Sequence, residues 1–286
     1  SGIPIMGSRE RIKEAHEKYG VDEIIIAIPS ATRTIVREIY EDSRDLKCPI
    51  KRYGSMTDVN QNSLDNIQIA DIDVEDLLGR DSIKLDKKII ENFIKDKTIL
   101  ITGGAGSIGS EVCRQALKNG ARKIIIFDFN ENGLFNIDRE LSAVYKRQEK
   151  YELILGSIRD YNRLNNIIRE FKPNIVFHAA AHKHVPMMEY NPKEAIKNNV
   201  FGTLNVAKAS VLHNVEKFIL ISTDKAVNPT NIMGASKRIA ELIVQSMNRE
   251  DATEFAAVRF GNVLGSNGSV IPTFKEQIEK GGPVTV

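Results

Sequence analysis

Residues 97–109 read KTILITGGAGSIG, an apolar strand pattern that runs directly into a glycine-rich turn. Gly104, Gly106 and Gly109 match the spacing G-x-G-x-x-G, and Gly103, Gly106 and Gly109 match the related spacing G-x-x-G-x-x-G. A helical pattern follows as far as Lys118 and stops at Asn119-Gly120, a typical helix end. A strand, a glycine turn and a helix in this order predict a turn that binds phosphate at the helix N-terminus.

An acidic residue stands where such a site needs one. Asp128 ends the next strand pattern, 19 residues after Gly109, as expected of a carboxylate that binds a ribose 2′-hydroxyl. Because it would repel the 2′-phosphate of NADP, and no arginine directly follows it, we expect NAD as the cofactor. Asp160, after the third strand, either accepts from the adenine amino group or belongs to a simple turn. The cofactor residues predicted here are Gly103, Gly106, Ser107, Ile108, Gly109, Asp128 and Asp160.

The periodicity of the following residues predicts five more strands, separated by helical patterns. They lie near residues 123–127, 153–155, 175–177, 218–221 and 256–259. Apolar strands that alternate with helices form a parallel sheet covered on both faces. The predicted fold class is therefore α/β, a doubly wound parallel Rossmann sheet.

A smaller α/β unit is predicted before this sheet. Residues 9–19 and 32–45 are amphipathic, and residues 24–29 and 49–53 resemble strands. From residue 56 to about 86 the periodicity fades into Asn, Asp and Gln. We therefore expect a partial N-terminal α/β unit at 1–56 whose beginning is missing, a linker at 57–86, and an NAD-binding Rossmann catalytic domain at 87–286.

The composition excludes several classes of protein. Forty Lys and Arg against 38 Asp and Glu leave a formal charge of +2, too balanced for a broad basic face, so no nucleic acid partner is expected. No run approaches the roughly 18 apolar residues of a membrane span, so a soluble, cytoplasmic chain is expected. Two cysteines fit a reducing compartment. Neither the acidic run at 71–76 nor the histidines at 178, 182 and 184 have the spacing of a metal site.

Longer motifs carry a family resemblance. They are TGGAGSIG at 102–109, HAAAHKHVP at 178–186, NVFGT at 199–203, STDKAVNPTNIMGASKR at 222–238, RFGNVLGS at 259–266 and GSVIP at 268–272. With them the chain from about residue 98 to 274 resembles the extended short-chain dehydrogenase/reductase superfamily. Within that superfamily it is similar to the long, CapD-like UDP-N-acetylglucosamine 4,6-dehydratases. The resemblance implies bound NAD, a UDP-sugar substrate and a role in surface glycan or capsule biosynthesis.

The resemblance also locates a catalytic helix. The superfamily carries Tyr-x-x-x-Lys there, and the matching positions hold Met233 and Lys237. Residues i and i+4 are neighbours on a helix, so Lys237 is expected to reach the nicotinamide ribose while position 233 faces the reacting carbon. A thioether cannot take a proton. The long dehydratases likewise carry methionine at this place, so the missing tyrosine fits that branch.

A substitute for the tyrosine base is expected at Thr223, Asp224 and Lys225, at the carboxyl end of a strand. Acid–base chemistry there would need the Lys225 pKa shifted down and the Asp224 pKa shifted up. A surface salt bridge is the alternative interpretation of this pair. In the predicted reaction, oxidation at sugar carbon 4 precedes proton removal at carbon 5 by Lys225. Asp224 then protonates the hydroxyl that leaves carbon 6 as water, and hydride returns to carbon 6.

The remaining predicted site residues support the cofactor and the substrate. Around the cofactor we expect Ala179, Ala180, Ala181, Asn199 and Ser222. Toward the substrate diphosphate or sugar we expect Lys183, Arg259 and Asn262. Purely structural roles are the alternative for Asn199, Ser222, Arg259 and Asn262.

Two other functions stay open from the sequence: a nucleotide-sugar epimerase, and a catalytically silent NAD-binding module. An epimerase at carbon 4 needs no acid for carbon 6 and would normally keep the tyrosine. The resemblance further implies a homo-oligomer paired through helices near 193–213 and 234–249. It also implies a parent protein tethered to the cytoplasmic face of the inner membrane, and a substrate lid that continues beyond residue 286.

Overall fold

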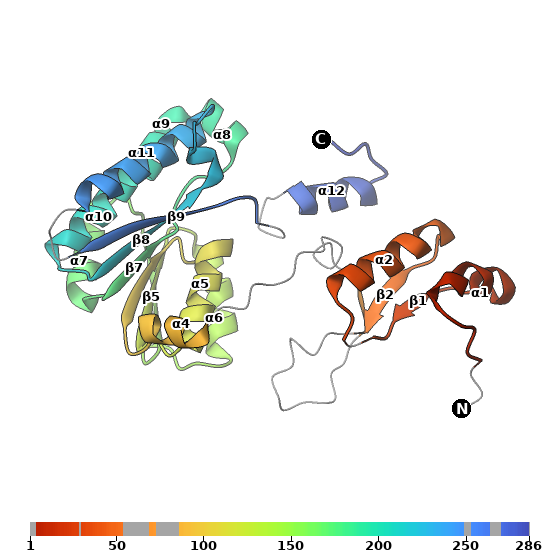
Figure 1. Ribbon diagram of the computed structural model, residues 1–286. Coiled ribbons are helices and arrows are strands. Elements are labelled where there is room, and N and C mark those ends of the chain that lie inside the picture. The colour runs from red at the N-terminus through yellow and green to blue at the C-terminus, as the bar shows by residue number, and fades with distance from the viewer. Residues whose placement is uncertain are drawn as a thin grey trace. The chain divides into compact units, whose positions relative to one another are not determined.

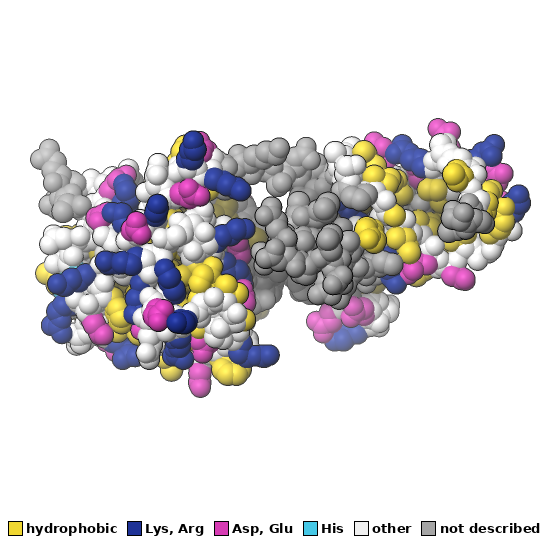
Figure 2. Space-filling view, turned by 90° about the horizontal axis from the view of Figure 1, so that it is seen from below, with side chains coloured by type: hydrophobic (Ala, Val, Ile, Leu, Met, Phe, Trp, Pro, Cys, Tyr) yellow, Lys and Arg dark blue, Asp and Glu magenta, His cyan; other side chains and the backbone are white. Residues whose placement is uncertain are grey.

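The computed structural model describes residues 4–28, 30–53, 69–72, 86–248, 253–263 and 270–285. The chain divides into two compact units, Ser1–Leu85 and Asp86–Val286. Figure 2 shows basic and acidic side chains intermixed on the face in view, as expected from the balanced composition. In the described part of the chain, no helix combines the length and apolar character needed to cross a membrane.

The second unit is built on a six-stranded parallel sheet (Figure 1). Its order across the sheet is β6-β5-β4-β7-β8-β9. The strands are β4 (Thr98–Thr102), β5 (Lys123–Asp128), β6 (Tyr151–Leu155), β7 (Ile175–His178), β8 (Lys217–Thr223) and β9 (Glu254–Phe260). The chain winds outward from β4 in one direction and from β7 in the other, which confirms the predicted doubly wound sheet.

Helices cover both faces of this sheet (Figure 1). One face carries α4 (Lys87–Ile94), α5 (Ser107–Lys118) and α6 (Glu131–Ser142), and the other carries α7 (Tyr161–Phe171), α10 (Thr203–Leu212) and α11 (Ile232–Met247). Successive strand residues point to opposite faces, so Ile99 and Ile101 enter one core while Leu100 enters the other. Because both faces are buried, every residue of β4 is buried, including the threonines that flank its three apolar residues.

The connection from β7 to α10 was not predicted in detail. It contains the short helices α8 (Val185–Tyr190) and α9 (Pro192–Ala195), followed by a π-helical segment, Ile196–Gly202. π-Helical turns are rare and often occur at functional sites. This one buries Asn198 and Asn199 against the carboxyl end of the sheet.

The switch point of the sheet lies between β4 and β7, where the connections lead away in opposite directions. In open parallel sheets the crevice at the carboxyl ends of two such strands binds the ligand. Here the glycine turn leaves β4 at this edge, Asp128 ends β5, and residues 179–184 leave β7.

Among its described residues, the first unit is a small mixed sheet packed with α-helices. It contains α1 (Ile12–Tyr19), β1 (Ile24–Ile26), α2 (Arg33–Ser43), β2 (Ile50–Tyr53) and β3 (Ile69–Asp71). β1 and β2 are parallel, as predicted, whereas β3 pairs antiparallel to β2. The prediction of a linker at 57–86 is therefore wrong for residues 69–71, because a strand of three residues shows too little alternation to be recognised. The other residues of that predicted linker, apart from 72 and 86, lie outside the described residues.

Candidate active site

Three positions of the glycine turn require glycine, each for a different steric reason. Gly103 has φ +70°, and a Cβ there would lie 2.5 Å from the Ala180 nitrogen. A Cβ on Gly109 would lie 2.1 Å from the Gly103 carbonyl oxygen. Gly106 is less crowded, with its nearest contact at 3.3 Å. Gly103 thus permits the close approach of β4 to β7, Gly109 packs the helix on the turn, and Gly106 leaves room for a ligand.

The turn opens directly into α5. Gly106 is its N-cap in extended conformation, and Ser107, Ile108 and Gly109 form its first turn. Amides of a first helical turn have no acceptor within the helix, and the helix dipole gives them positive character. The structure therefore places the predicted phosphate-binding residues at a helix end suited to a pyrophosphate.

Asp128 ties this turn to the end of β5. Its side chain is buried, with Oδ2 accepting from the Ala105 amide at 2.9 Å and Oδ1 accepting from the Asn130 amide at 2.9 Å. Each carboxylate oxygen has a second lone-pair direction, so a ribose hydroxyl can still donate to it. The arrangement fits the predicted role of Asp128 and adds a structural one, which is to hold the glycine turn.

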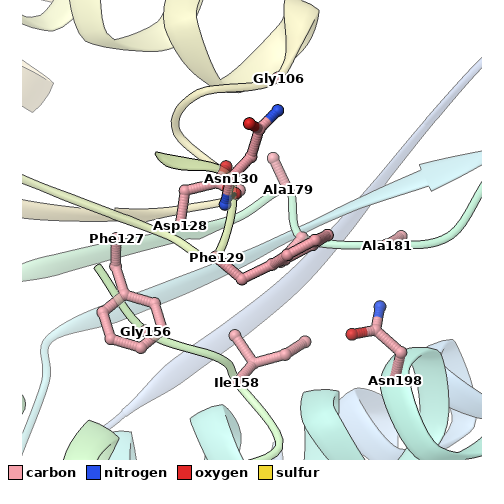
Figure 3. Close-up of a pocket in the computed structure, with 12 residues that line it drawn as sticks. Gly106, Phe127, Asp128, Phe129, Asn130, Gly156, Ile158, Ala179, Ala181 and Asn198 are labelled. Atoms are coloured by element: carbon pink, nitrogen blue, oxygen red, sulfur yellow. Dashed lines mark hydrogen bonds between the residues drawn. The ribbon is translucent and has the colours of Figure 1, made fainter. Parts of the chain in front are cut away.

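A cavity of about 190 Å³ lies at this edge of the sheet (Figure 3). Its lining includes six of the predicted residues, namely Gly103, Gly106, Asp128, Ala179, Ala180 and Ala181. Sequence reasoning missed the other lining residues, which are Phe127, Phe129, Asn130, Gly156, Ile158 and Asn198. All but Asn198 lie at or just after the ends of β5 and β6, a position that could have identified them. In Figure 3 the Phe129 side chain extends across the cavity toward Ala181.

Asp160 does not line this cavity. It is the N-cap of α7, where Oδ1 accepts from the Arg163 amide at 3.0 Å. The structure supports the interpretation of Asp160 as part of a turn. Aspartate is a preferred N-cap residue because its side chain satisfies a first-turn amide, and this signal was readable from the sequence.

The predicted catalytic trio lies at the carboxyl end of β8. Thr223 is the last strand residue, and Asp224–Ala226 form one turn of 3₁₀ helix. The Thr223 hydroxyl donates to Asp224 Oδ1 at 2.9 Å, and Lys225 Nζ donates to the same oxygen at 3.1 Å. Lys225 Nζ also donates to Asn262 Oδ1 at 2.9 Å. The structure thus brings Asn262, which we had expected at the substrate diphosphate, against the Lys225 amine.

The electrostatics of Asp224 contradict one prediction. Hydrogen bonds from Thr223 and Lys225 hold the pKa of Asp224 below its ordinary value, whereas we expected the pKa to be raised. The reason is that the side chain is 56% exposed and has a cation beside it, so little desolvation opposes its ionisation. In this arrangement Asp224 is a carboxylate and accepts a proton before it can donate one.

Met233 and Lys237 are both buried on α11. Met233 packs with Met188 and Ala195, and Lys237 Nζ donates to the Ile221 carbonyl at 2.7 Å. Burial lowers the pKa of Lys237 to about 8, although the negative charge of Glu241 opposes that shift. The two residues are one helical turn apart, as predicted, behind the end of β8.

Glu241, one further turn along α11, was missed from the sequence and is the partner of two predicted site residues, Ser222 and Arg259. Its side chain is only 5% exposed. Arg259 donates to it at two points, Nε to Oε1 at 2.8 Å and Nη2 to Oε2 at 2.6 Å, and the Ser222 hydroxyl donates to Oε1 at 2.6 Å. Arg259 and Ser222 are therefore both bonded to Glu241, which supports the structural alternative for these two residues. The i, i+4 spacing from Lys237 could have pointed to Glu241.

Asn199 supports the cavity wall from behind. Its Oδ1 accepts from the His182 amide at 2.8 Å, and its Nδ2 donates to the His182 carbonyl and to Ser236 Oγ, each at 3.0 Å. These bonds fasten the segment after β7 to α11. Asn199 therefore orders the pocket indirectly, while its neighbour Asn198 lines the cavity.

His178 closes the end of β7 with a chain of buried hydrogen bonds. The Thr102 hydroxyl lies 2.6 Å from Nδ1, Nε2 lies 2.9 Å from Thr203 Oγ1, and Thr203 donates to the Asn199 carbonyl at 2.6 Å. Complete burial lowers the pKa of His178 to about 3. The ring is therefore neutral and joins β4, β7 and α10.

Lys183 and the motifs at 259–272 complete the predicted site residues. Lys183 is exposed on the segment that follows the cavity wall. Residues 264–269, which belong to the motifs at 259–266 and 268–272, lie outside the described residues. Across the ranges that the structure describes, no three His, Cys, Asp or Glu side chains are grouped so as to hold a metal ion.

A change of Gly109 to Ala tests the glycine turn. Because the new Cβ would lie 2.1 Å from the Gly103 carbonyl oxygen, the turn has to shift. Overpacking typically costs about 1–3 kcal/mol, so the affinity for NADH should fall about ten- to a hundredfold. Titration followed by NADH fluorescence measures it. The control is Gly120→Ala, which is strained by φ +84° but remote from the turn, and unchanged affinity in both variants would contradict this role.

A change of Glu241 to Gln tests the buried ion pair through pH. Hydrogen bonds, led by those from Arg259, lower the pKa of Glu241 to about 2 from an ordinary 4.5. A lowered pKa contributes stability above the unfolded-state value, and this stability is lost as the pH falls. The variant should be about 3 kcal/mol less stable at pH 7, and this gap should narrow by about 1.4 kcal/mol at pH 3.5. Urea unfolding followed by circular dichroism measures the gap, and a gap independent of pH contradicts the assignment.

Comparison with known proteins places this geometry in a family. Residues 99–286 match the family model described as "Polysaccharide biosynthesis protein". The chain is 47% identical over 285 residues to the capsular polysaccharide biosynthesis protein CapD of Staphylococcus aureus. The matched residues make up 99% of this chain and 48% of that protein. The chain thus spans about half the length of this curated relative.

Two shorter matches each cover about two thirds of the chain. A UDP-glucose 4-epimerase of Rickettsia bellii is 41% identical over 197 residues, covering 67% of this chain and 56% of that protein. An inverting UDP-N-acetylglucosamine 4,6-dehydratase of Campylobacter jejuni is 41% identical over 196 residues, covering 66% of this chain and 57% of that protein. The two relatives carry the names of different reactions.

Solved structures share the fold. Pen from Bacillus thuringiensis superposes with a TM-score of 0.64 at 38% identity, covering 68% of this chain and 61% of that one. A Thermus thermophilus UDP-glucose 4-epimerase in complex with NAD gives a TM-score of 0.56 at 26% identity, covering 66% of this chain and 65% of that one. Together with the glycine turn, Asp128 and the Met233–Lys237 helix, these matches show that the chain belongs to the polysaccharide biosynthesis protein family, as a CapD-like extended short-chain dehydrogenase/reductase.

Proposed function

We propose that this chain binds NAD at the switch point and removes water from UDP-N-acetylglucosamine, giving a 4-keto-6-deoxy sugar nucleotide for surface glycan synthesis. The observation that carries the proposal is the hydrogen-bonded trio of Thr223, Asp224 and Lys225. It lies beside the helix α11, which carries Met233 at the position where the superfamily carries tyrosine. An acid and a base are thus available where the helix itself supplies none.

The choice of NAD rests on the cavity. The first turn of α5 offers amides and a positive dipole end to a pyrophosphate, and the buried Asp128 carboxylate accepts from a ribose hydroxyl but repels a phosphate. The NAD complex of the Thermus thermophilus epimerase, which shares this fold, supports the same cofactor. When bound, NAD would take a hydride from sugar carbon 4 and return it to carbon 6.

The chain's own residues would move the protons in a fixed order. The hydroxyl at carbon 4 gives its proton, through Thr223 Oγ1, to the Asp224 carboxylate. Lys225 releases its proton to solvent and then takes the proton from carbon 5, which the neighbouring ketone acidifies. Protonated Asp224 then donates to the carbon 6 hydroxyl, which leaves as water. Lys225 finally returns the carbon 5 proton and regains one from solvent, so both side chains end in their starting states.

An epimerase that acts at carbon 4 is the second candidate. The Rickettsia bellii relative, named a UDP-glucose 4-epimerase, supports it at the same identity as the named dehydratase. Epimerisation needs the oxidation at carbon 4 but no acid at carbon 6. The paired Asp224 and Lys225 therefore favour dehydration.

Mass analysis of the product separates the candidates. Incubation with UDP-N-acetylglucosamine and NAD should give loss of water; unchanged mass with a new epimer supports the epimerase, and no reaction supports a silent NAD-binding module. Asp224→Asn and Lys225→Ala should each lower water loss at least about 100-fold, because positioned acid–base groups contribute that much. NAD affinity should persist in both.

The matched control is Lys217→Ala, which breaks the ion pair with Glu254 at the opposite end of the same strand. It should leave turnover unchanged. Full turnover in either site variant would rule out the assigned acid and base.

A further inference from the structure

Glu241 accepts hydrogen bonds from four donors, and this saturates its carboxylate. Oε1 accepts from Ser222 Oγ and Arg259 Nε, and Oε2 accepts from Arg259 Nη2 and, at 3.1 Å, from Arg238 Nη1. Two carboxylate oxygens offer about four acceptor directions, so every direction is used. This buried charge takes no part in the proton transfers of the proposed reaction.

Its partners are neighbours in the sheet. Ser222 of β8 and Arg259 of β9 are register partners, and the next pair outward is Thr223 with Phe260. Beyond that pair the strands end, and Lys225 Nζ meets Asn262 Oδ1. Glu241 therefore holds the two strand ends together one residue before the catalytic trio begins.

Glu241 also fixes the position of α11 along β8. Met233, Lys237 and Glu241 are spaced at i, i+4 and i+8, so they share one face of the helix. Lys237 Nζ donates to the Ile221 carbonyl, and Glu241 accepts from the adjacent Ser222 hydroxyl. Two successive turns of the helix are thus attached to two successive residues of β8.

We infer that Glu241 is a positioning residue: through Ser222 and Arg259 it sets the distance between α11, which carries Met233 and Lys237, and the strand ends that carry Asp224, Lys225 and Asn262. This inference rests on the proposed function for its catalytic consequence. Glu241 does not touch the cavity and moves no proton. Its effect is expected on the rate of the chemical step and not on substrate binding.

Glutamine is a sharp probe of this role. It keeps the size of Glu241 but replaces one acceptor oxygen with an amide that has two donors, which then faces Arg259 and either Ser222 or Arg238. The strand ends should separate locally. Arg259→Lys is a milder second variant, because it keeps the positive charge and loses the planar two-point contact.

The experiment measures kcat and KM for water loss from UDP-N-acetylglucosamine in the holoenzyme. Misplacing a catalytic group by about 1 Å can cost about 100-fold, so we expect kcat to fall at least about tenfold in Glu241→Gln and Arg259→Lys, with KM within about threefold. The control is Glu140→Gln, which breaks another two-point pair, with Arg114 between α6 and α5, on the other face of the sheet. It should keep kcat, and equal losses in all three variants would overturn the inference.

Hydrogen exchange separates this inference from the proposed reaction. Amides of residues 221–226 should exchange at least about tenfold faster in Glu241→Gln and not in Glu140→Gln, because only the first change loosens the strand ends. Unchanged exchange there overturns the positioning role, whatever the activity. Faster exchange in Glu241→Gln, together with an unmodified protein that releases no water from the substrate, would support the positioning role and overturn the proposed dehydration.

Discussion

The close approach of two chain segments at the switch point is the constraint on which the site depends. Gly103 turns the chain out of β4 with its Cα directly against the backbone of Ala179 and Ala180, where no side chain fits. Because the segments touch, the glycine turn before α5 and the residues that follow β7 line the same cavity. Asp128 then ties the turn to β5 through the Ala105 amide. A cofactor site made of backbone atoms requires this contact first.

Two buried charges extend that constraint to the chemical end of the site. Lys237 is buried and reaches the Ile221 carbonyl, while Glu241, one turn later, takes four donors. Burying either charge alone would be costly, and the negative charge of Glu241 opposes the fall of the Lys237 pKa. The helix is therefore held at a defined depth by interactions that are directional, in contrast to the apolar packing of Met233 above them.

The sequence determines the fold and the backbone part of the site more fully than the side-chain part. Strand periodicity and glycine spacing identify β4, the turn and Asp128, because only a few residue types satisfy those conformations. Ser222, Arg259 and Asp160 were each open between a ligand contact and a structural role, and the structure gives each a protein partner. Motif membership says which residues occur together but not which way they point. Strand alternation would have placed Ser222 on the face opposite to Thr223.

The prediction for Asp224 failed for a reason that clarifies the proposed chemistry. A carboxylic acid was expected because water needs a proton to leave, and this led to a raised pKa. The exposed side chain with Thr223 and Lys225 beside it is ionised instead. An ionised Asp224 can only act as the acid if an earlier step protonates it, and oxidation at carbon 4 releases one proton together with the hydride. The order of the two chemical steps then follows from the charge state of one residue, since dehydration cannot precede the step that supplies its proton.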